Sequence, residues 1–278
     1  MVKRLIKNNT LSNPQFVHQI EFFFSILPKK INMRKSIITL FSILFLLCFT
    51  SSIMLVSCIE KKSNKNFVLT GNIKGLKRGT LFIQRIKDTI LVAIDTIKID
   101  GDSHFTSEFD LQSPQMLYLF LDRGVTNSID NNIPFFAERG KMNIETSLDF
   151  FTADVKITGS KNQELYDEYK KVVSRYVDQD LTLIEKKFKA IKAKKIDEVN
   201  KIEEEQKGVL KRKYLYSTNF AVNHGDYEVA PYVALAEIYD INLKYMDTIQ
   251  KSMTPKIAKS MYGKKLTDFI AARKQEEK

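Results

Sequence analysis

Cys58 is the residue of this chain whose surroundings point most directly to chemistry, because a thiol is a nucleophile and its flanks resemble a processing site. Residues 36–56, just before it, carry no charge, and Arg34 and Lys35 precede that run. A charged start, an apolar run and a small residue, here Ser57, form the pattern of a secretory signal. A run of this length can also cross a bilayer as an uncleaved helix, so the spacing leaves two interpretations open.

The tetrad Leu55-Val56-Ser57-Cys58 resembles the lipobox of bacterial lipoproteins, in which an aliphatic residue lies three before the cysteine and a small one just before it. The resemblance implies that the Cys58 thiol takes a diacylglyceryl group, that a peptidase cuts before Cys58, and that the new amino terminus is acylated. Each buried methylene contributes about 0.8 kcal/mol, so several chains hold a protein at a membrane. We therefore expect a lipid anchor rather than an uncleaved helix, and we interpret Cys48 as a small hydrophobe.

Residues 1–57 are thus predicted to be a signal segment, and residues 58–66 a short polar tether. Met33 and the two cations after it form a complete n-region, so we expect residues 1–32 to precede the true start; a long n-region is the alternative. The tether lacks the acidic run that tends to mark surface export in Bacteroidota lipoproteins. We therefore expect an outer-membrane protein that faces the periplasm.

The composition excludes several classes of protein. The 278 residues include 44 Lys and Arg against 33 Asp and Glu, which gives a formal charge of +11, and 44% are apolar. This is ordinary globular composition, so a fully disordered chain and a multispan membrane protein are excluded. Two cysteines are too few for a disulfide scaffold or a four-cysteine zinc site, and without a CxxC motif the chain has no thiol redox pair of its own.

Residues 67–160 are predicted to form an antiparallel β-sandwich or a barrel-like module, within an α+β protein. Apolar residues recur along short segments that turn residues interrupt. These segments are 67–73, 80–83, 91–94, 96–99, 105–109, 116–121, 135–138, 142–144 and 155–157. Asp100-Gly101-Asp102, between two of them, is a hairpin signal.

Residues 161–278 are predicted to be helical, because the apolar period changes there. A helical hairpin comes first, followed by short helices. We expect helices at about 162–192, 197–223, 229–240, 242–252 and 266–273, with a further short one that Thr254 and Pro255 open. Gly225 is placed for a C-cap of the second helix. Five tyrosines at helical spacing are expected to be core residues: Tyr227, Tyr232, Tyr239, Tyr245 and Tyr262.

The β segments also resemble a known family of domains through the order and spacing of small motifs. These are Phe67-x-Leu69-x-Gly71-x-Ile73-x-Gly75-Leu76, Gly79-Thr80-Leu81, Ile94-Asp95-Thr96, Asp100-Gly101 with Phe105, Pro114, Phe135-x-x-Glu138-x-Gly140-x-Met142-x-Ile144 and Ile157-Thr158-Gly159-Ser160. They look like the domain of unknown function numbered 4369, which typically precedes a thioredoxin-like domain in Bacteroidota periplasmic lipoproteins. No thioredoxin domain follows in these 278 residues, so a redox role is not carried over; a gene truncated before that domain is one explanation.

Six lysines between residues 186 and 195 could suggest a nucleic-acid-binding arm. They are Lys186, Lys187, Lys189, Lys192, Lys194 and Lys195. Glu203-Glu204-Glu205 follows, and no aromatic platform alternates with the lysines as base stacking would require. We therefore expect a solvated hairpin of mixed charge and no nucleic-acid partner, with weak attraction to anionic lipid or lipopolysaccharide as the alternative.

Acidic and histidine side chains give no metal or catalytic pattern. Asp95, Asp100 and Asp102 lack the alternating ligands and final Glu of a calcium loop, and turn chemistry explains the last two. His104 and His224 have no neighbour at metal-ligand spacing, and no hydrolase, metalloprotease or phosphate-loop motif is present. We therefore expect no catalytic residue, metal or cofactor.

Taken together, these features predict a non-catalytic binding or accessory protein of the cell envelope. Its partners would be the membrane, through the N-terminal lipid at Cys58, and an envelope protein. The alternative is an accessory component of a periplasmic thiol-disulfide pathway that acts with a separate thioredoxin-like protein. An enzyme with a site that no motif reveals is a third hypothesis.

Overall fold

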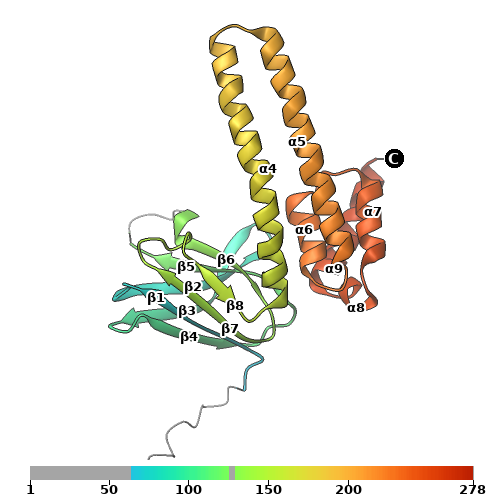
Figure 1. The fold of residues 1–278 in the computed structure, drawn as a ribbon. Helices are drawn as coiled ribbons and strands as arrows, with labels where there is room; N and C mark the ends of the chain where they lie inside the picture. The colour runs from blue at the N-terminus through green and yellow to red at the C-terminus, as the bar shows by residue number, and fades with distance from the viewer. Residues whose placement is uncertain (1–63, 125–128, 278) are drawn as a thin grey trace, which may run out of the picture. The chain divides into compact units, whose positions relative to one another are not determined.

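The computed structural model describes residues 64–124 and 129–277, which belong to one compact unit. Its first part contains eight strands in two four-stranded sheets (Figure 1). The strands are β1 (Phe67–Lys74), β2 (Arg78–Lys87), β3 (Ile90–Asp100), β4 (His104–Phe109), β5 (Gln115–Asp122), β6 (Asn132–Ala137), β7 (Gly140–Ser147) and β8 (Lys156–Thr158), with a 3-10 turn at Ile129–Asn131. One sheet has the order β4-β1-β7-β8 and the other β3-β2-β5-β6.

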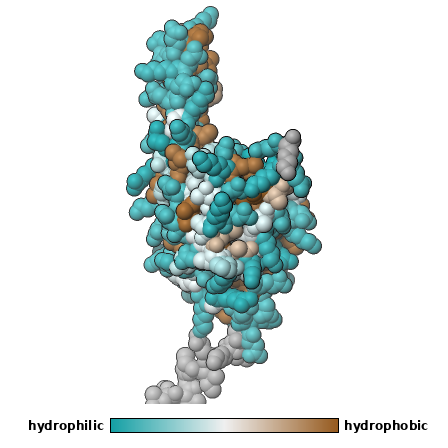
Figure 2. All heavy atoms as spheres, turned by 90° about the vertical axis from the view of Figure 1, so that its right-hand side faces the viewer, coloured by the Kyte–Doolittle hydropathy of each residue, from teal (hydrophilic) through white to brown (hydrophobic). Residues whose placement is uncertain are grey.

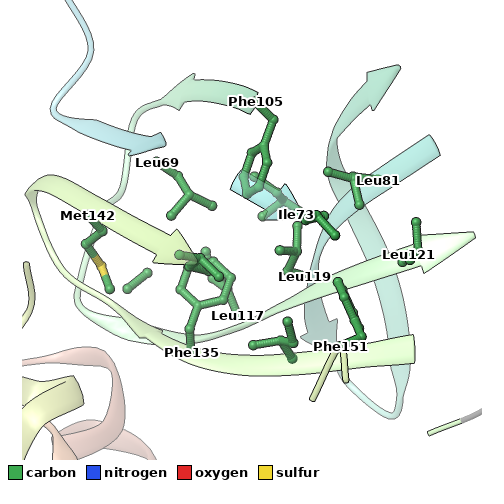
Figure 3. Close-up of a cluster of buried hydrophobic side chains, with 14 of the residues drawn as sticks. Leu69, Ile73, Leu81, Phe105, Leu117, Leu119, Leu121, Phe135, Met142 and Phe151 are labelled. Carbon is green, nitrogen blue, oxygen red and sulfur yellow. The ribbon is translucent and has the colours of Figure 1, made fainter. Parts of the chain in front are cut away.

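The two sheets share one hydrophobic core, which confirms the sandwich-like module. Strand β1 alternates buried and partly exposed residues, so that Phe67, Leu69 and Ile73 point into that core. Figure 3 shows side chains of both sheets gathered in it, including Leu69, Ile73, Leu81, Phe105, Leu117, Leu119, Leu121, Phe135 and Met142. The sheets do not close on each other, so the barrel alternative is wrong.

Strand pairing departs from the purely antiparallel expectation at one place. β1 pairs antiparallel with β4 but parallel with β7, where Phe67 lies opposite Gly140 and Lys74 opposite Ser147. Gly71 is required at the centre of β1, because a Cβ there would lie 2.4 Å from both the Ile144 carbonyl oxygen and the Phe105 ring. A parallel partner distant in sequence carries no local signal, since pairing of this kind needs a long crossover connection.

Six helices follow the sheets, close to the predicted segments. They are α4 (Lys161–Lys192), α5 (Ile196–Asn223), α6 (Val229–Glu237), α7 (Leu243–Ser252), α8 (Pro255–Ala258) and α9 (Met261–Glu276). Ser160 caps α4 by accepting a hydrogen bond from the Gln163 N–H (3.1 Å), and Thr254 caps α8 ahead of Pro255, as predicted. The last helix begins five residues earlier than expected, because Ser260 caps it.

Helices α4 and α5 form a long antiparallel hairpin that projects beyond the sheets (Figure 1). Gly225 does not end α5 as a left-handed cap. The cap residue is His224, and Gly225 is instead buried where a Cβ would lie 2.2 Å from the Ser252 carbonyl oxygen. The prediction of a C-cap glycine is therefore wrong, because close packing against the end of α7 is what requires the glycine. Among the described residues, no helix has the length and apolar character needed to cross a membrane.

Candidate binding surface on the helical hairpin

The predicted lipid-attachment residue Cys58 and the lipobox residues Leu55, Val56 and Ser57 lie outside the described residues. The end of the predicted tether is described, and it is fixed to the β module. Asn66 Nδ2 donates to the Leu111 carbonyl oxygen (3.1 Å), and its Oδ1 accepts from the Leu111 N–H (2.6 Å). The described part of the chain is therefore fixed to the β module from Asn66 onward, eight residues after Cys58.

The three aspartates considered for a cation site have separate partners. Asp95 accepts from the Thr96 N–H (2.8 Å) and from the Ser107 hydroxyl. Asp100 pairs with Arg78 (3.1 Å). Asp102 accepts from the backbone N–H of His104 and contacts its ring Nδ1 (2.7 Å), and these bonds lower the pKa of Asp102. The three carboxylates thus serve local turns and strand ends.

The histidines occupy local structural positions as well. His104 contacts Asp102 on the surface, while His224 Nδ1 lies 2.8 Å from the Phe220 carbonyl oxygen at the end of α5. Within residues 64–124 and 129–277, no three His, Cys, Asp or Glu side chains are grouped so that they could hold a metal ion.

Asn162 joins the β module to the helices through a buried polar cluster that sequence analysis did not find. Its Nδ2 donates to Glu138 Oε2 (3.2 Å) and to Glu228 Oε2 (3.4 Å). Its Oδ1 accepts from the Val229 N–H (2.9 Å) at the start of α6. Since Asn162 is 1% exposed and its amide bonds to groups of two other segments, it holds α4, α6 and the end of β6 in place.

The two carboxylates of this cluster could suggest an acid–base pair, but their environment indicates a structural role. Glu138 Oε2 also accepts from the Ser160 hydroxyl (3.1 Å) and the Asn162 N–H (3.3 Å). Burial raises the pKa of Glu228, Glu138 adds to the effect, and hydrogen bonds and the charge of Lys256 oppose it. The carboxyl oxygens that Asn162 contacts are therefore engaged inside the protein.

An aromatic cluster fills the space between the outer face of the β5–β6 pair and the helices. Its buried residues include Met116, Phe136, Tyr166, Tyr169, Phe220 and Tyr262, with Tyr232 partly buried beside them. Tyr262 Oη accepts from the buried Met116 N–H (3.0 Å), and Tyr169 and Ser217 share a hydroxyl hydrogen bond (2.9 Å). Burial raises the pKa of Tyr166 to about 12 and that of Tyr262 as well, so these phenols are neutral packing groups.

The prediction that the five C-terminal tyrosines are core residues is only partly correct. Tyr262 is buried, and Tyr227 and Tyr232 are partly buried. Tyr239 and Tyr245 are 58% and 39% exposed, so for them the prediction is wrong. Both lie where α6 ends and α7 begins, at the surface of the helical region, and helical spacing alone could not separate them from the buried three.

The hairpin is held together by one seam of small and apolar contacts. Leu183 and Ala190 of α4 pack on Ile202 and Val209 of α5. Polar contacts reinforce the seam: Gln206 donates to Asp180 (2.8 Å), and Lys187 pairs with Glu203 (2.8 Å). The lysine cluster therefore forms part of a hairpin of mixed charge, with Lys189 and Lys195 also paired to Glu185 and Glu198.

A second apolar row on α4 lies beside this seam, toward one face of the hairpin. Its members are Val177, Leu181, Ile184, Phe188 and Ile191. Four of them are exposed, from 44% for Val177 to 68% for Phe188, and Ile184 is partly exposed. Helix α5 adds Ile196 (67%) and Leu210 (48%). In Figure 2, hydrophobic residues are visible among hydrophilic ones along the hairpin, up to its tip.

Part of this row lines a groove along the hairpin with a cavity volume of about 460 Å³. Its α4 side consists of Tyr176, Val177, Asp180 and Leu181, and its α5 side includes Glu203, Gln206 and Leu210. Monomeric proteins rarely leave large contiguous apolar patches uncovered, so this groove is the candidate binding surface among the described residues. The sequence showed the apolar period of α4 but not that it comprises two rows, one packed and one exposed.

Residues 67–166 match the model of a family described as a domain of unknown function, DUF4369. This finding confirms the resemblance, and the match covers the two sheets and the first turns of α4. The hairpin groove and all later helices lie beyond it. Comparison with curated proteins gave no match, and comparison with solved structures gave none.

Proposed function

We propose that this chain, which carries a DUF4369 domain at residues 67–166, is a lipid-anchored cell-envelope protein of binding or accessory type. Cys58 would carry the lipid, at the outer membrane and facing the periplasm. The observation that carries the binding role is the exposed apolar row of α4 beside the groove between α4 and α5. The hydrogen bonds of Asn162 to Glu138, Glu228 and Val229 support a structural role for this polar cluster.

The anchor is tested by labelling lipoproteins with a clickable palmitate analogue in cells that produce the full chain. We expect labelling of the unmodified chain, loss of labelling in Cys58→Ala, and retention in the matched variant Cys48→Ala. The unmodified chain should also fractionate with membranes. Label that persists in Cys58→Ala would overturn the anchor.

The binding role is tested by replacing exposed residues of the row. Leu181→Glu places a charge in the groove, and Thr182→Glu is its matched control on a neighbouring exposed position. We expect complexes captured by cross-linking in the envelope to be lost in the first variant only. Equal complex formation by both variants, with both folded, would remove the groove as the binding surface.

The resemblance to domains that precede thioredoxin-like partners keeps one alternative testable in the same experiment. A thioredoxin-like lipoprotein recovered with the chain, together with a changed thiol status of envelope proteins in a deletion strain, would favour the accessory redox role. If no thioredoxin-like lipoprotein is recovered and the thiol status is unchanged, the binding role stands as proposed.

A further inference from the structure

We propose that the occupant of the hairpin groove is a second copy of this chain, which docks antiparallel so that two hairpins form a four-helix bundle. This inference rests on the proposed function, since it names the partner of the hairpin. The α4 row gives the first argument. Its successive members are four, three, four and three residues apart, which is the heptad spacing of a coiled-coil seam. Such a row fits another helix with the same spacing, and α4 itself offers one.

The opposite side of the groove has the same spacing. Ile196, Val199, Glu203, Gln206 and Leu210 of α5 follow one another at three, four, three and four residues. The two rows therefore run side by side along one face of the hairpin, and residues of both line the groove. A face with two heptad rows is what one half of a four-helix bundle presents to the other.

Both rows are centred at the same level of the hairpin. Ile184, in the middle of the α4 row, lies nine residues before Ala193, and Glu203, in the middle of the α5 row, lies nine residues after Lys194. Consider a two-fold axis that lies in the interface at this level and runs across the face from α4 to α5. This axis places each row opposite the same row of the second copy, with the paired helices antiparallel. A surface that is complementary to itself in this way is the requirement for an isologous dimer.

The resulting contacts along the α4 row and at the ends of the α5 row match apolar residues with apolar residues, while Val199 meets the partner's Gln206. Val177 meets the partner's Ile191, Leu181 meets the partner's Phe188, and Ile196 meets the partner's Leu210. Near the axis, Ile184 meets the partner's Ile184. Glu203 also lies near the axis, and Lys187 of the same chain neutralises it through their 2.8 Å ion pair.

Charges at the outer edge of the α4 row favour the antiparallel direction. Asp178, Glu185 and Lys192 follow one another at seven-residue intervals, so they share the edge of the row that lies away from α5. In the antiparallel dimer, Asp178 approaches the partner's Lys192 at both ends, while Glu185, near the axis, keeps Lys189 as its ion-pair partner. A parallel dimer would instead place the two six-lysine segments together.

The size of the face fits a modest interface. Two helices about 10 Å wide and about 21 Å of hairpin length give on the order of 400 Å² per copy. The total, on the order of 800 Å², is the size of a weak interface, below the roughly 1,000 Å² of a stable specific one. Anchoring both copies in one membrane would raise their effective concentration, so the dimer is expected to be stronger at the membrane than in dilute detergent.

Photo-cross-linking of the full chain in intact cells tests the proposal. The photo-reactive residue p-benzoylphenylalanine replaces Phe188 in the test variant. It replaces Lys186, on another face of α4, in the matched control, and the unmodified chain is the blank. Two epitope tags on co-produced copies identify a homodimer. We expect a dimer band that carries both tags from position 188, at least about fivefold stronger than that from position 186.

Each other outcome has a defined meaning. A strong adduct from position 188 with a different protein would overturn the second copy as occupant and leave the proposed function standing. No adduct from position 188, with folded protein, would overturn both. A dimer band of equal strength from both positions would indicate collision in the membrane and would also overturn the proposal.

A charge exchange tests the direction of the helices. Asp178→Lys and Lys192→Glu each place like charges together at two symmetric sites, so either change should lower the cross-linked fraction about tenfold. The combination of both changes in one chain restores opposite charges at both sites and should restore cross-linking. Failure of the double variant to recover, when it is folded, would overturn the antiparallel register.

Discussion

Met116 and Tyr262 are 146 residues apart in sequence, yet the backbone N–H of Met116 donates to the Tyr262 hydroxyl oxygen at 3.0 Å in a buried environment. This bond links strand β5 to the last helix. It lies inside the aromatic cluster, where Phe136 and Tyr232 pack beside Tyr262. The sheets and the helical region are therefore joined by directional bonds as well as by apolar contact.

The change Tyr262→Phe should destabilise the protein by about 1–3 kcal/mol, because it removes the acceptor of a buried N–H and leaves the ring in place. Urea unfolding measures the loss. Tyr245→Phe, at a 39% exposed position, is the matched control and should change the free energy of unfolding by less than about 0.5 kcal/mol. Equal effects of the two changes would contradict a special role for the Met116 bond.

Asn162→Ala should be more damaging, because it leaves Glu138, Glu228 and the Val229 N–H without their shared partner. A loss of about 2–4 kcal/mol is expected when several buried polar groups lose a hydrogen bond together. Asn200→Ala, on the exposed side of α5, is the control and should be neutral or slightly stabilising. Thermal unfolding followed by circular dichroism distinguishes the two, and similar curves for both would show that the cluster does not hold the junction.

Glu228→Gln should alter how stability depends on pH. Burial raises the pKa of Glu228 in the folded protein, so the folded state favours the protonated form. As the pH rises through that pKa, the unmodified chain loses stability that the glutamine variant keeps. The variant is thus expected to have the higher Tm at pH 7, with the difference shrinking below about pH 4.5. Glu205→Gln, at an exposed position of α5, should show no such trend.

Two glycines of the same helical region should respond in opposite ways to alanine. Gly225→Ala places a Cβ at 2.2 Å from the Ser252 carbonyl oxygen, so the end of α5 and the end of α7 must move apart and stability must fall. Gly208→Ala, within α5, meets only the flexible end of Arg212 at 3.5 Å and should stabilise by about 0.5–1 kcal/mol. Chemical denaturation of both variants checks the signs, and a neutral Gly225→Ala would contradict the close approach.

Much of the fold was predictable because its signals are local. The alternation in residues 67–73 predicts β1, the apolar run 116–121 predicts β5, and the period from residue 162 onward predicts α4 nearly to its last residue. Capping by Thr254 and Pro255 is also a local feature. The parallel pairing of β1 with β7 was not predictable, since it depends on residues about 73 positions apart.

The proposed binding surface was harder to predict from the sequence, for a physical reason. Helix α4 is identified by the spacing of Leu181, Ile184, Phe188 and Ile191. However, the sequence of a helix with apolar residues on two sides is the same whether other elements cover one of those sides or both. Only the position of α5 shows that Leu183 and Ala190 face it and that Phe188 does not. The cluster at Asn162 likewise joins residues 138, 162 and 228, which no spacing rule connects.

The place of β1 between β4 and β7 has a consequence for the order of folding. During synthesis, its antiparallel partner β4 is complete once residue 109 has left the ribosome. Its parallel partner β7 is complete only after residue 147. Until then one side of β1 is an open strand edge. Pairings between distant segments slow folding, whereas α4 and α5 are adjacent in sequence and can pair as soon as both have formed. The sheet containing β1 should therefore be the slow, rate-limiting part of refolding, and the interval before β7 arrives is when the chain is most exposed to aggregation and most in need of a chaperone.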